Sequence, residues 1–149
     1  MMFQFDINLS ELLYSDLPTD TFAQRLTKAK LLADVTQVQL AELTGLSKSA
    51  IDSIESGKRD NITIDTLKKL LTVLDEDILC DDYYRFILHQ EENIKDLINK
   101  YSFPTLLEKL NVHRSTLERY RDGKIKISQK MYYIICRNFL NGKYYTEVI

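Results

Sequence analysis

The sequence predicts an all-α protein made of two small helical bundles in tandem. Its composition is 44% hydrophobic and 28% charged with only two prolines and four glycines, which is typical of a folded helical protein. Apolar residues recur at helical spacing along most of the chain. A stretch that begins at Leu40 is repeated, with similar residues in the same order, from Leu106.

The two ends of the chain have a different pattern. Residues 1–8 alternate apolar and polar side chains, and residues 144–149 are rich in β-prone side chains. The ends could pair as a short β ribbon, within one chain or between two, although isolated two-stranded ribbons are marginally stable. Residues 1–20 are interpreted as an N-terminal arm, with one helical turn at residues 10–15 that ends before Pro18.

The first helix of the next domain is predicted to begin after Thr21, because Thr21 and Gln24 have the spacing of a capping box. It should extend to about Ala33 and bury Phe22 and Leu26. Its three cationic side chains are expected on its outer side: Arg25, Lys28 and Lys30.

Two shorter helices should follow and form a helix-turn-helix motif. Thr36 begins the first of them with a second capping-box signature, and Gly45 can take the left-handed conformation that ends it. Ser47 is expected to cap the next helix. The small Ala41 lets the two helices cross closely. The apolar positions of the first helix are Leu40, Ala41 and Leu43.

The second helix of the motif has one apolar and one polar face. Ala50, Ile51 and Ile54 lie at helical spacing and should face the core. A short-chained polar surface of this kind is what a helix in a DNA major groove offers to base edges and phosphates. The polar face consists of Lys48, Ser49, Asp52, Ser53 and Ser56.

A loop and a further helix should complete this domain. Lys58 and Arg59 place two adjacent positive charges in the loop, and Thr63 or Asp65 should cap a helix that runs to about residue 74 or 75. The acidic residues at 75–77 and 81–82 repel one another and mark a boundary, so we assign residues 21–80 to the first domain. Residues 81–101 would form a connecting segment of one long helix or two joined helices.

Residues from about Phe22 to Leu74 resemble the Cro/CI (XRE) family of helix-turn-helix DNA-binding domains. The resemblance rests on Gln37, Leu40–Glu42, Gly45, Ser47–Ile51 and Ile54–Lys58. It implies sequence-specific binding of double-stranded DNA, with recognition helix 47–56 in the major groove. In such a domain base edges would be contacted by Lys48, Ser49 and Ser53. Phosphates would be held by Gln37, Ser47, Ser56 and Lys58, with Arg59 as a neighbouring cation.

The second half contains a degenerate copy of the motif. Leu40, Glu42, Ser49, Gly57 and Lys58 recur 66 positions later as Leu106, Glu108, Ser115, Gly123 and Lys124. Ser102 should cap a helix through Leu110, and Asn111 replaces Gly45. Leu107 replaces Ala41, which should push the two helices of the copy apart. We therefore interpret residues 102–149 as a second helix-turn-helix-like unit, in which a helix at 128–140 supplies the packing partner.

The second recognition helix, residues 113–121, would be strongly cationic. By the same correspondence, base edges would be contacted by Arg114, Ser115 and Arg119, and each arginine could bind guanine with two hydrogen bonds. Phosphates would be held by Arg121, Lys124 and Lys126, and His113 lies beside them. The charge supports this view, because residues 1–82 have 8 basic and 15 acidic side chains whereas residues 83–149 have 12 basic and 7 acidic ones. A solvated basic surface or a site for a partner protein would give the same pattern.

Other classes of function find no support in the sequence. There is no glycine-rich phosphate loop and no GxSxG sequence, and Cys80, Cys136, His89 and His113 lack the spacing of metal ligands. The cysteines and the tyrosine pairs are expected in the core. The chain has no apolar run of about eighteen residues and no secretory signal pattern, so we expect a cytoplasmic protein that is not an enzyme and needs no cofactor or metal.

Two hypotheses remain open. The first is a transcriptional regulator, a repressor, that binds double-stranded DNA as a homodimer or through both motifs of one chain. The second is a DNA-binding antitoxin or inhibitor whose C-terminal half binds a partner protein or mediates dimerisation.

Overall fold

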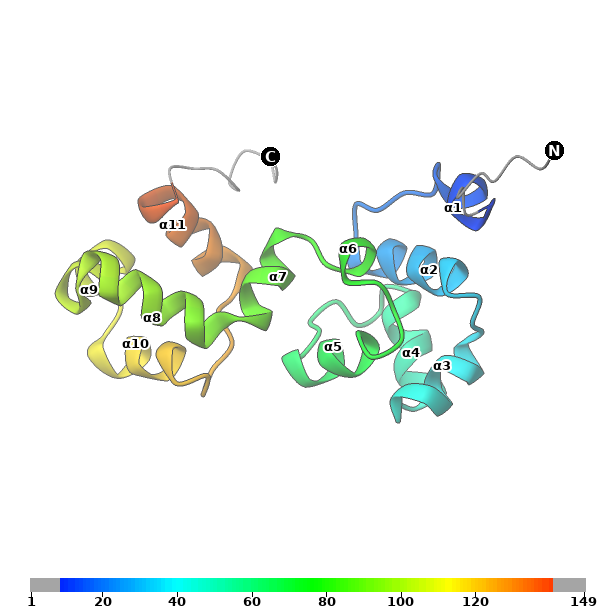
Figure 1. The fold of residues 1–149 in the computed structure, drawn as a ribbon. Helices are drawn as coiled ribbons and strands as arrows, with labels where there is room; N and C mark the ends of the chain where they lie inside the picture. Colours follow the sequence, from blue (N-terminus) through cyan, green and yellow to red (C-terminus); the bar gives the residue numbers. More distant parts are fainter. Residues whose placement is uncertain (1–8, 141–149) are drawn as a thin grey trace. The chain divides into compact units, whose positions relative to one another are not determined.

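A computed structural model describes residues 9–140 of the chain, and this part contains eleven α-helices and no strand (Figure 1). The prediction of an all-α protein is therefore confirmed for these residues. The predicted β ribbon falls on residues 1–8 and 144–149, which lie outside the described part. The chain divides into two compact units, residues 1–81 and residues 82–149. None of the described helices combines the length and the apolar character needed to cross a membrane.

The first unit contains six helices in the described residues. They are α1 (Leu9–Tyr14), α2 (Phe22–Leu32), α3 (Gln37–Thr44), α4 (Lys48–Glu55), α5 (Ile64–Leu70) and α6 (Glu76–Leu79). Both predicted capping boxes are present, at Thr21 and at Thr36. Of the two candidate caps, Thr63 and not Asp65 caps α5. This helix ends at Leu70 and is shorter than predicted. The chain continues in turns, in which the amides of Thr72 and Val73 donate to carbonyl oxygens three residues earlier.

The core of the first unit forms where α2 and α3 pack against α4. Leu26, Leu40, Ile51 and Ile54 are fully buried, as their helical spacing predicts. Leu43 was expected in this core, but 61% of its surface is exposed. The buried stripe of α3 consists of Leu40 and Thr44, which lie four residues apart, and Leu43 lies beside this stripe.

Arg25 corrects the prediction that the cations of α2 all lie on its outer side. Only 7% of Arg25 is exposed, because α6 folds back onto α2 and covers it. Its guanidinium donates hydrogen bonds to the carbonyl oxygens of Leu79 (3.0 Å) and Thr19 (3.1 Å) and pairs with Asp81 at 3.4 Å. Lys30 also turns inward and pairs with Glu55 of α4 at 2.8 Å.

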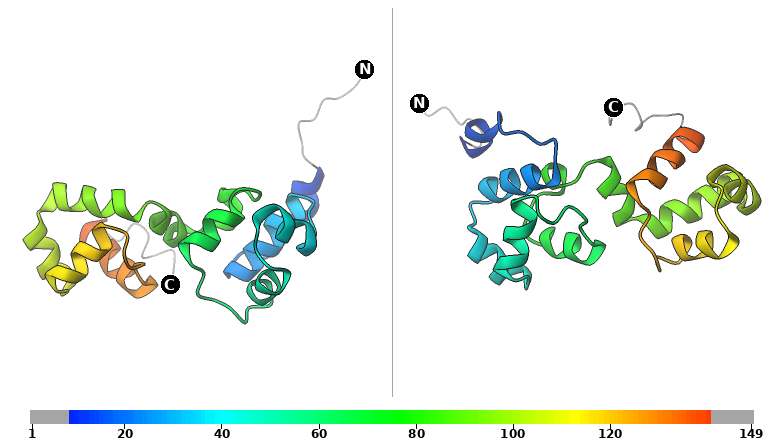
Figure 2. Two further views of the ribbon diagram at one scale, coloured as in Figure 1. Left: turned by 90° about the horizontal axis from the view of Figure 1, so that it is seen from below. Right: turned by 180° about the vertical axis from the view of Figure 1, so that it is seen from behind.

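The second unit contains α7 (Asp82–Leu88), α8 (Gln90–Tyr101), α9 (Phe103–Leu110), α10 (Arg114–Arg121) and α11 (Gln129–Phe139). Residues 82–101 thus form two joined helices, the second of the two alternatives left open by the sequence. α8 packs on both α9 and α10, and α11 packs on α9 (Figure 2). The fully buried side chains of this unit include Ile94, Leu106, Leu117, Ile127, Tyr132 and Ile135.

The two cysteines lie in the core, and so do three of the four tyrosines of the predicted pairs that fall in the described residues. Cys80 and Cys136 are buried and free. Tyr83, Tyr84 and Tyr132 are buried, and the ring of Tyr132 lies edge-on to that of Tyr83 at 5.6 Å between centroids. These rings therefore stabilise the second unit, as aromatic pairs in a core do.

Candidate nucleic-acid interface

The α3–turn–α4 segment has the backbone geometry of a helix-turn-helix motif. α3 ends at Gly45, whose φ of 79° and ψ of 4° are left-handed, as predicted. The hydroxyl of Ser47 accepts a hydrogen bond from the Ala50 amide at 3.0 Å and so begins α4. The turn between the two helices is therefore fixed by a glycine at one end and a serine cap at the other.

The face of α4 that points away from the core carries short polar side chains and one lysine. Lys48, Ser49, Asp52 and Ser56 are exposed, and Ser53 is partly buried. The eight residues of α4 make a helix about 12 Å long, and the first-turn amides have no acceptor within the helix. A helix of this size and chemistry can enter a major groove. The Ala50 amide is bonded to the Ser47 cap, so the amides of Lys48 and Ser49 are the ones that could face a phosphate.

A glutamate at the end of α4 anchors this helix to α2 and α3. One oxygen of Glu55 accepts hydrogen bonds from Lys30 Nζ at 2.8 Å and from Gln37 Nε2 at 2.9 Å, and the other accepts from the Thr27 hydroxyl at 2.8 Å. Burial, the largest single influence, raises the pKa of Glu55, but these hydrogen bonds together lower it below the ordinary value. The carboxylate is therefore charged at neutral pH and ties three helices together.

This cluster changes the position expected for Gln37. The sequence predicts that Gln37 holds a phosphate. In the structure its side-chain amide nitrogen donates to Glu55 and lies 3.5 Å from Asp52 Oδ1. The side chain is partly buried between α3 and α4. The structure thus gives Gln37 a positioning contact that the sequence did not indicate.

The loop after α4 places its cations next to the exposed face. Gly57 has a φ of 82° and turns the chain, and the amide of Arg59 donates to the Ser53 carbonyl at 3.0 Å. Lys58 is exposed and Arg59 is partly buried. The loop is held against the end of α4 by backbone hydrogen bonds.

The α9–turn–α10 segment has matching local geometry. Ser102 caps α9, and Asn111 ends it with a left-handed φ of 53° and ψ of 50°, where Gly45 ends α3. The Gly123 amide donates to the Tyr120 carbonyl, as the Gly57 amide does to the Ile54 carbonyl 66 residues earlier. α10 differs in its start, because His113 makes no side-chain cap.

The cations of α10 and its loop lie on the surface but several have acidic neighbours. Arg114 Nε pairs with Glu118 at 2.9 Å and its guanidinium lies 5.0 Å from the centroid of the Phe103 ring, while Arg121 Nε pairs with Asp122 at 2.9 Å. Burial lowers the pKa of Lys126. The surface of α10 is therefore of mixed charge. The remaining predicted residues of this motif are all exposed: His113, Ser115, Arg119 and Lys124.

The amide of Gln90 positions α10 and the loop after it. Gln90 is 3% exposed, donates from Nε2 to the carbonyls of Tyr120 (3.0 Å) and Ile125 (2.8 Å), and accepts at Oε1 from the Ile127 amide at 2.9 Å. No local pattern in the sequence indicates this role, because the partners lie 30 to 37 residues away. For Glu55 a weak signal existed, since it follows Ile51 and Ile54 at the edge of the buried stripe.

Comparison with known proteins identifies the first motif. Residues 26–79, which extend from α2 to α6, match the family described as Helix-turn-helix. No curated protein and no solved structure matches the chain. The matched segment is about a third of the chain and does not include α9 or α10. The match agrees with the geometry of α3 and α4, and residues 26–79 are similar to a helix-turn-helix domain of the Cro/CI type.

Proposed function

We propose that this chain is a transcriptional regulator, acting as a repressor, that binds double-stranded DNA sequence-specifically by placing α4 in a major groove. The observation that carries the proposal is the combination of a firmly anchored helix with an exposed polar face. Glu55 fixes one end of α4 to α2 and α3, and Ser47 caps the other. A rigid reading helix loses little conformational entropy when it binds.

The exposed side chains of α4 can read a short sequence. Lys48 can donate to the O6 and N7 acceptors of guanine, whereas the hydroxyl of Ser49 can contact any of the bases. Asp52, which the sequence placed on this face without a role, is an acceptor for the amino group of cytosine. Ser47, Ser56, Lys58 and Arg59 flank this face and would hold phosphates.

α10 is proposed as a second DNA-reading helix. Arg119 is exposed on α10, and Arg114 is 76% exposed at its side chain despite its pair with Glu118. Exposed ion pairs contribute little free energy, so a guanine can replace Glu118 as the partner of Arg114 at small cost. A homodimer or the two motifs of one chain would supply paired half-sites about 34 Å apart.

The test begins with selection of binding sites from random double-stranded DNA by the full chain. The Lys48→Ala variant should lose about 5- to 150-fold in affinity for the selected sequence and little for random DNA, since one good base contact contributes roughly 1–3 kcal/mol of discrimination. Lys68→Ala, which removes an exposed lysine from α5, is the matched control. Affinity should also fall steeply with salt. Equal binding to all sequences, or no enrichment in the selection, would refute the proposal.

A partner protein for the C-terminal half remains the second candidate, and the mixed charge of α10 favours it. The carboxylates of Glu118 and Asp122 repel a polyanion, whereas cationic side chains of a partner protein would complement them. Replacing Arg114 and Arg119 by Ala separates the two candidates, with Arg137→Ala on α11 as control. Lost DNA affinity supports a second reading helix. Unchanged DNA affinity would leave α4 as the reader and favour a partner-protein role for α10.

A further inference from the structure

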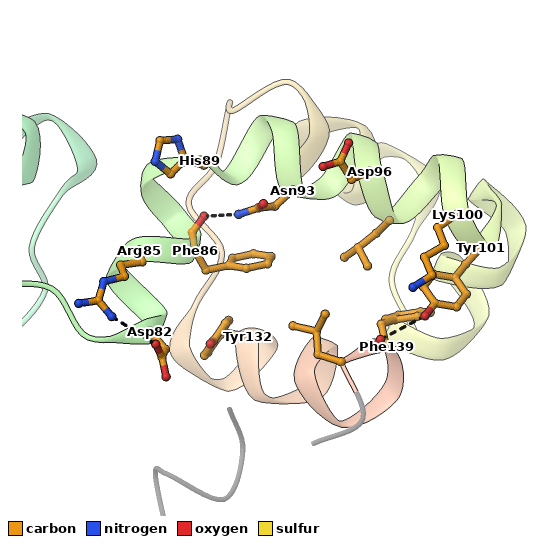
Figure 3. Close-up of a pocket in the computed structure, with 12 residues that line it drawn as sticks. Asp82, Arg85, Phe86, His89, Asn93, Asp96, Lys100, Tyr101, Tyr132 and Phe139 are labelled. Carbon is orange, nitrogen blue, oxygen red and sulfur yellow. Dashed lines mark hydrogen bonds and ion pairs between the residues drawn. The ribbon is translucent and has the colours of Figure 1, made fainter. Parts of the chain in front are cut away.

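The second unit has a groove between α8 and α11 with a volume of about 470 Å³ (Figure 3). Figure 3 shows polar side chains on one side, among them His89 just before α8 and Asn93 and Lys100 on α8. The rings of Tyr132 and Phe139 from α11 lie on the other side. Its apolar wall consists of Phe86, Leu97, Tyr101, Tyr132, Phe139 and Leu140. The groove is separate from the exposed face of α10.

The helix that corresponds to α8 in the first unit is α2. On α2 the buried residues Phe22, Leu26 and Ala29 have the spacing of Gln90, Ile94 and Leu97 on α8. α2 packs on α4 as α8 packs on α10. A shift of 68 positions therefore aligns the residues of α2 with those of α8.

The same shift matches Arg25 with Asn93, which lines the groove. Both donate a side-chain hydrogen bond to the segment before their helix: Arg25 Nη1 to the Thr19 carbonyl at 3.1 Å and Asn93 Nδ2 to the Phe86 carbonyl at 3.0 Å. Arg25 also donates from Nε to the carbonyl of Leu79, the last residue of α6. The surface of α8 around Asn93 therefore corresponds to the surface of α2 that α6 covers.

The chain after each motif also corresponds, with a shift of 65 positions. Ile62 and Ile127 are both fully buried, and the next residues, Thr63 and Ser128, cap α5 and α11. Farther on, Leu74 and Phe139 are buried to a similar degree, at 3% and 5% exposure. The same shift of 65 positions aligns the two buried residues at the end of α6 with two tyrosines. Leu79 aligns with Tyr144, and Cys80 aligns with Tyr145.

We propose that residues 141–149 of the same chain bind in this groove, with Tyr144 and Tyr145 taking the place that Leu79 and Cys80 take in the first unit. Leu140 itself lines the groove. Tyr144 and Tyr145 follow it by four and five residues, a reach of at most roughly 14–18 Å. An aromatic wall with a polar rim suits a tyrosine, which has an apolar ring and a hydroxyl that needs a partner. The segment would thereby complete the core of the second unit.

The direct test is NMR of the full chain. Nuclear Overhauser contacts should join the methyl groups of Leu97 and Leu140 to the ring protons of Tyr144 or Tyr145. A mixture of differently labelled chains identifies the source of the rings. The absence of such contacts overturns the proposal, and contacts found only between different chains overturn it in favour of a second copy of this chain.

A variant in which Tyr144 and Tyr145 are both replaced by Ser provides a second measurement. Amide hydrogen exchange at Leu97 and Tyr101 on α8 should become at least tenfold faster, whereas Lys143→Ala, a polar change in the same segment, should leave it unchanged. Amides of α4 in the first unit serve as the internal reference. Equal exchange in the double variant and the wild type would overturn the proposal, because the rings would then protect nothing on α8.

Discussion

Replacing Glu55 tests whether the contacts among α2, α3 and α4 hold the reading helix in place. The Glu55→Ala variant removes hydrogen bonds to Lys30, Gln37 and Thr27 and leaves an ammonium group whose side chain is only 15% exposed without its carboxylate. A hydrogen bond to a charged group contributes about 1.5–3 kcal/mol, and a half-removed buried pair costs about 3–5 kcal/mol. Because the pair keeps some contact with water, we expect a loss of roughly 2–4 kcal/mol.

The Glu55→Gln variant separates shape from charge. Glutamine can keep the bond from Thr27 but not the ion pair, so a smaller loss of roughly 1–2 kcal/mol is expected. The pKa of Glu55 in the folded protein lies below the ordinary value of a glutamate. The carboxylate therefore adds stability at pH values above its unfolded pKa, and this stability is lost as the pH falls through the folded pKa. The difference between wild type and Glu55→Gln should shrink over that acidic range.

Native-state hydrogen exchange at the amides of Leu40 and Ile51 is the suitable assay, because it reports the first unit alone. The control is Glu42→Ala, which removes an exposed glutamate from α3 and should change the free energy of unfolding by less than about 0.5 kcal/mol. If Glu55→Ala costs no more than this control, or if the advantage over Glu55→Gln does not depend on pH, the carboxylate does not anchor α4 and the reasoning fails.

Three further predictions concern the two turns and the buried amide. Gly45→Ala should lower the free energy of unfolding by about 1 kcal/mol in a thermal or denaturant experiment, because φ of Gly45 is 79° and alanine is strained there. Nothing lies within 4 Å of an added Cβ, so the loss would be conformational, and an unchanged midpoint would contradict this cause. At the matching position, Asn111→Gly should be nearly neutral and Asn111→Ala should cost roughly 1–2 kcal/mol, and equal effects of the two changes would argue against the left-handed turn. Gln90→Leu should cost about 2–4 kcal/mol and speed exchange at the Ile127 amide, because two buried backbone groups and one partly buried one lose their partners; protection equal to wild type would show that the side-chain amide is not needed.

Local patterns determined the elements of the fold. The capping residues Thr21, Thr36, Ser47 and Ser102 each begin a helix where the sequence predicts one, because a cap depends on atoms within three residues of itself. The left-handed conformations of Gly45 and Asn111 are equally local. The helix-turn-helix motif could therefore be located from the sequence, and the match of residues 26–79 agrees with it.

Contacts between distant residues were decided by the tertiary structure alone. Arg25 is buried because α6 returns over it from 54 residues away, and Gln90 bonds to a loop 35 residues later. The motif alone suggested that the side chain of Gln37 faces a phosphate, whereas in the structure it donates a hydrogen bond to Glu55. Helical periodicity gives the direction of a side chain around its own axis, but which neighbour meets that side depends on how the helices pack, and no local pattern encodes that packing.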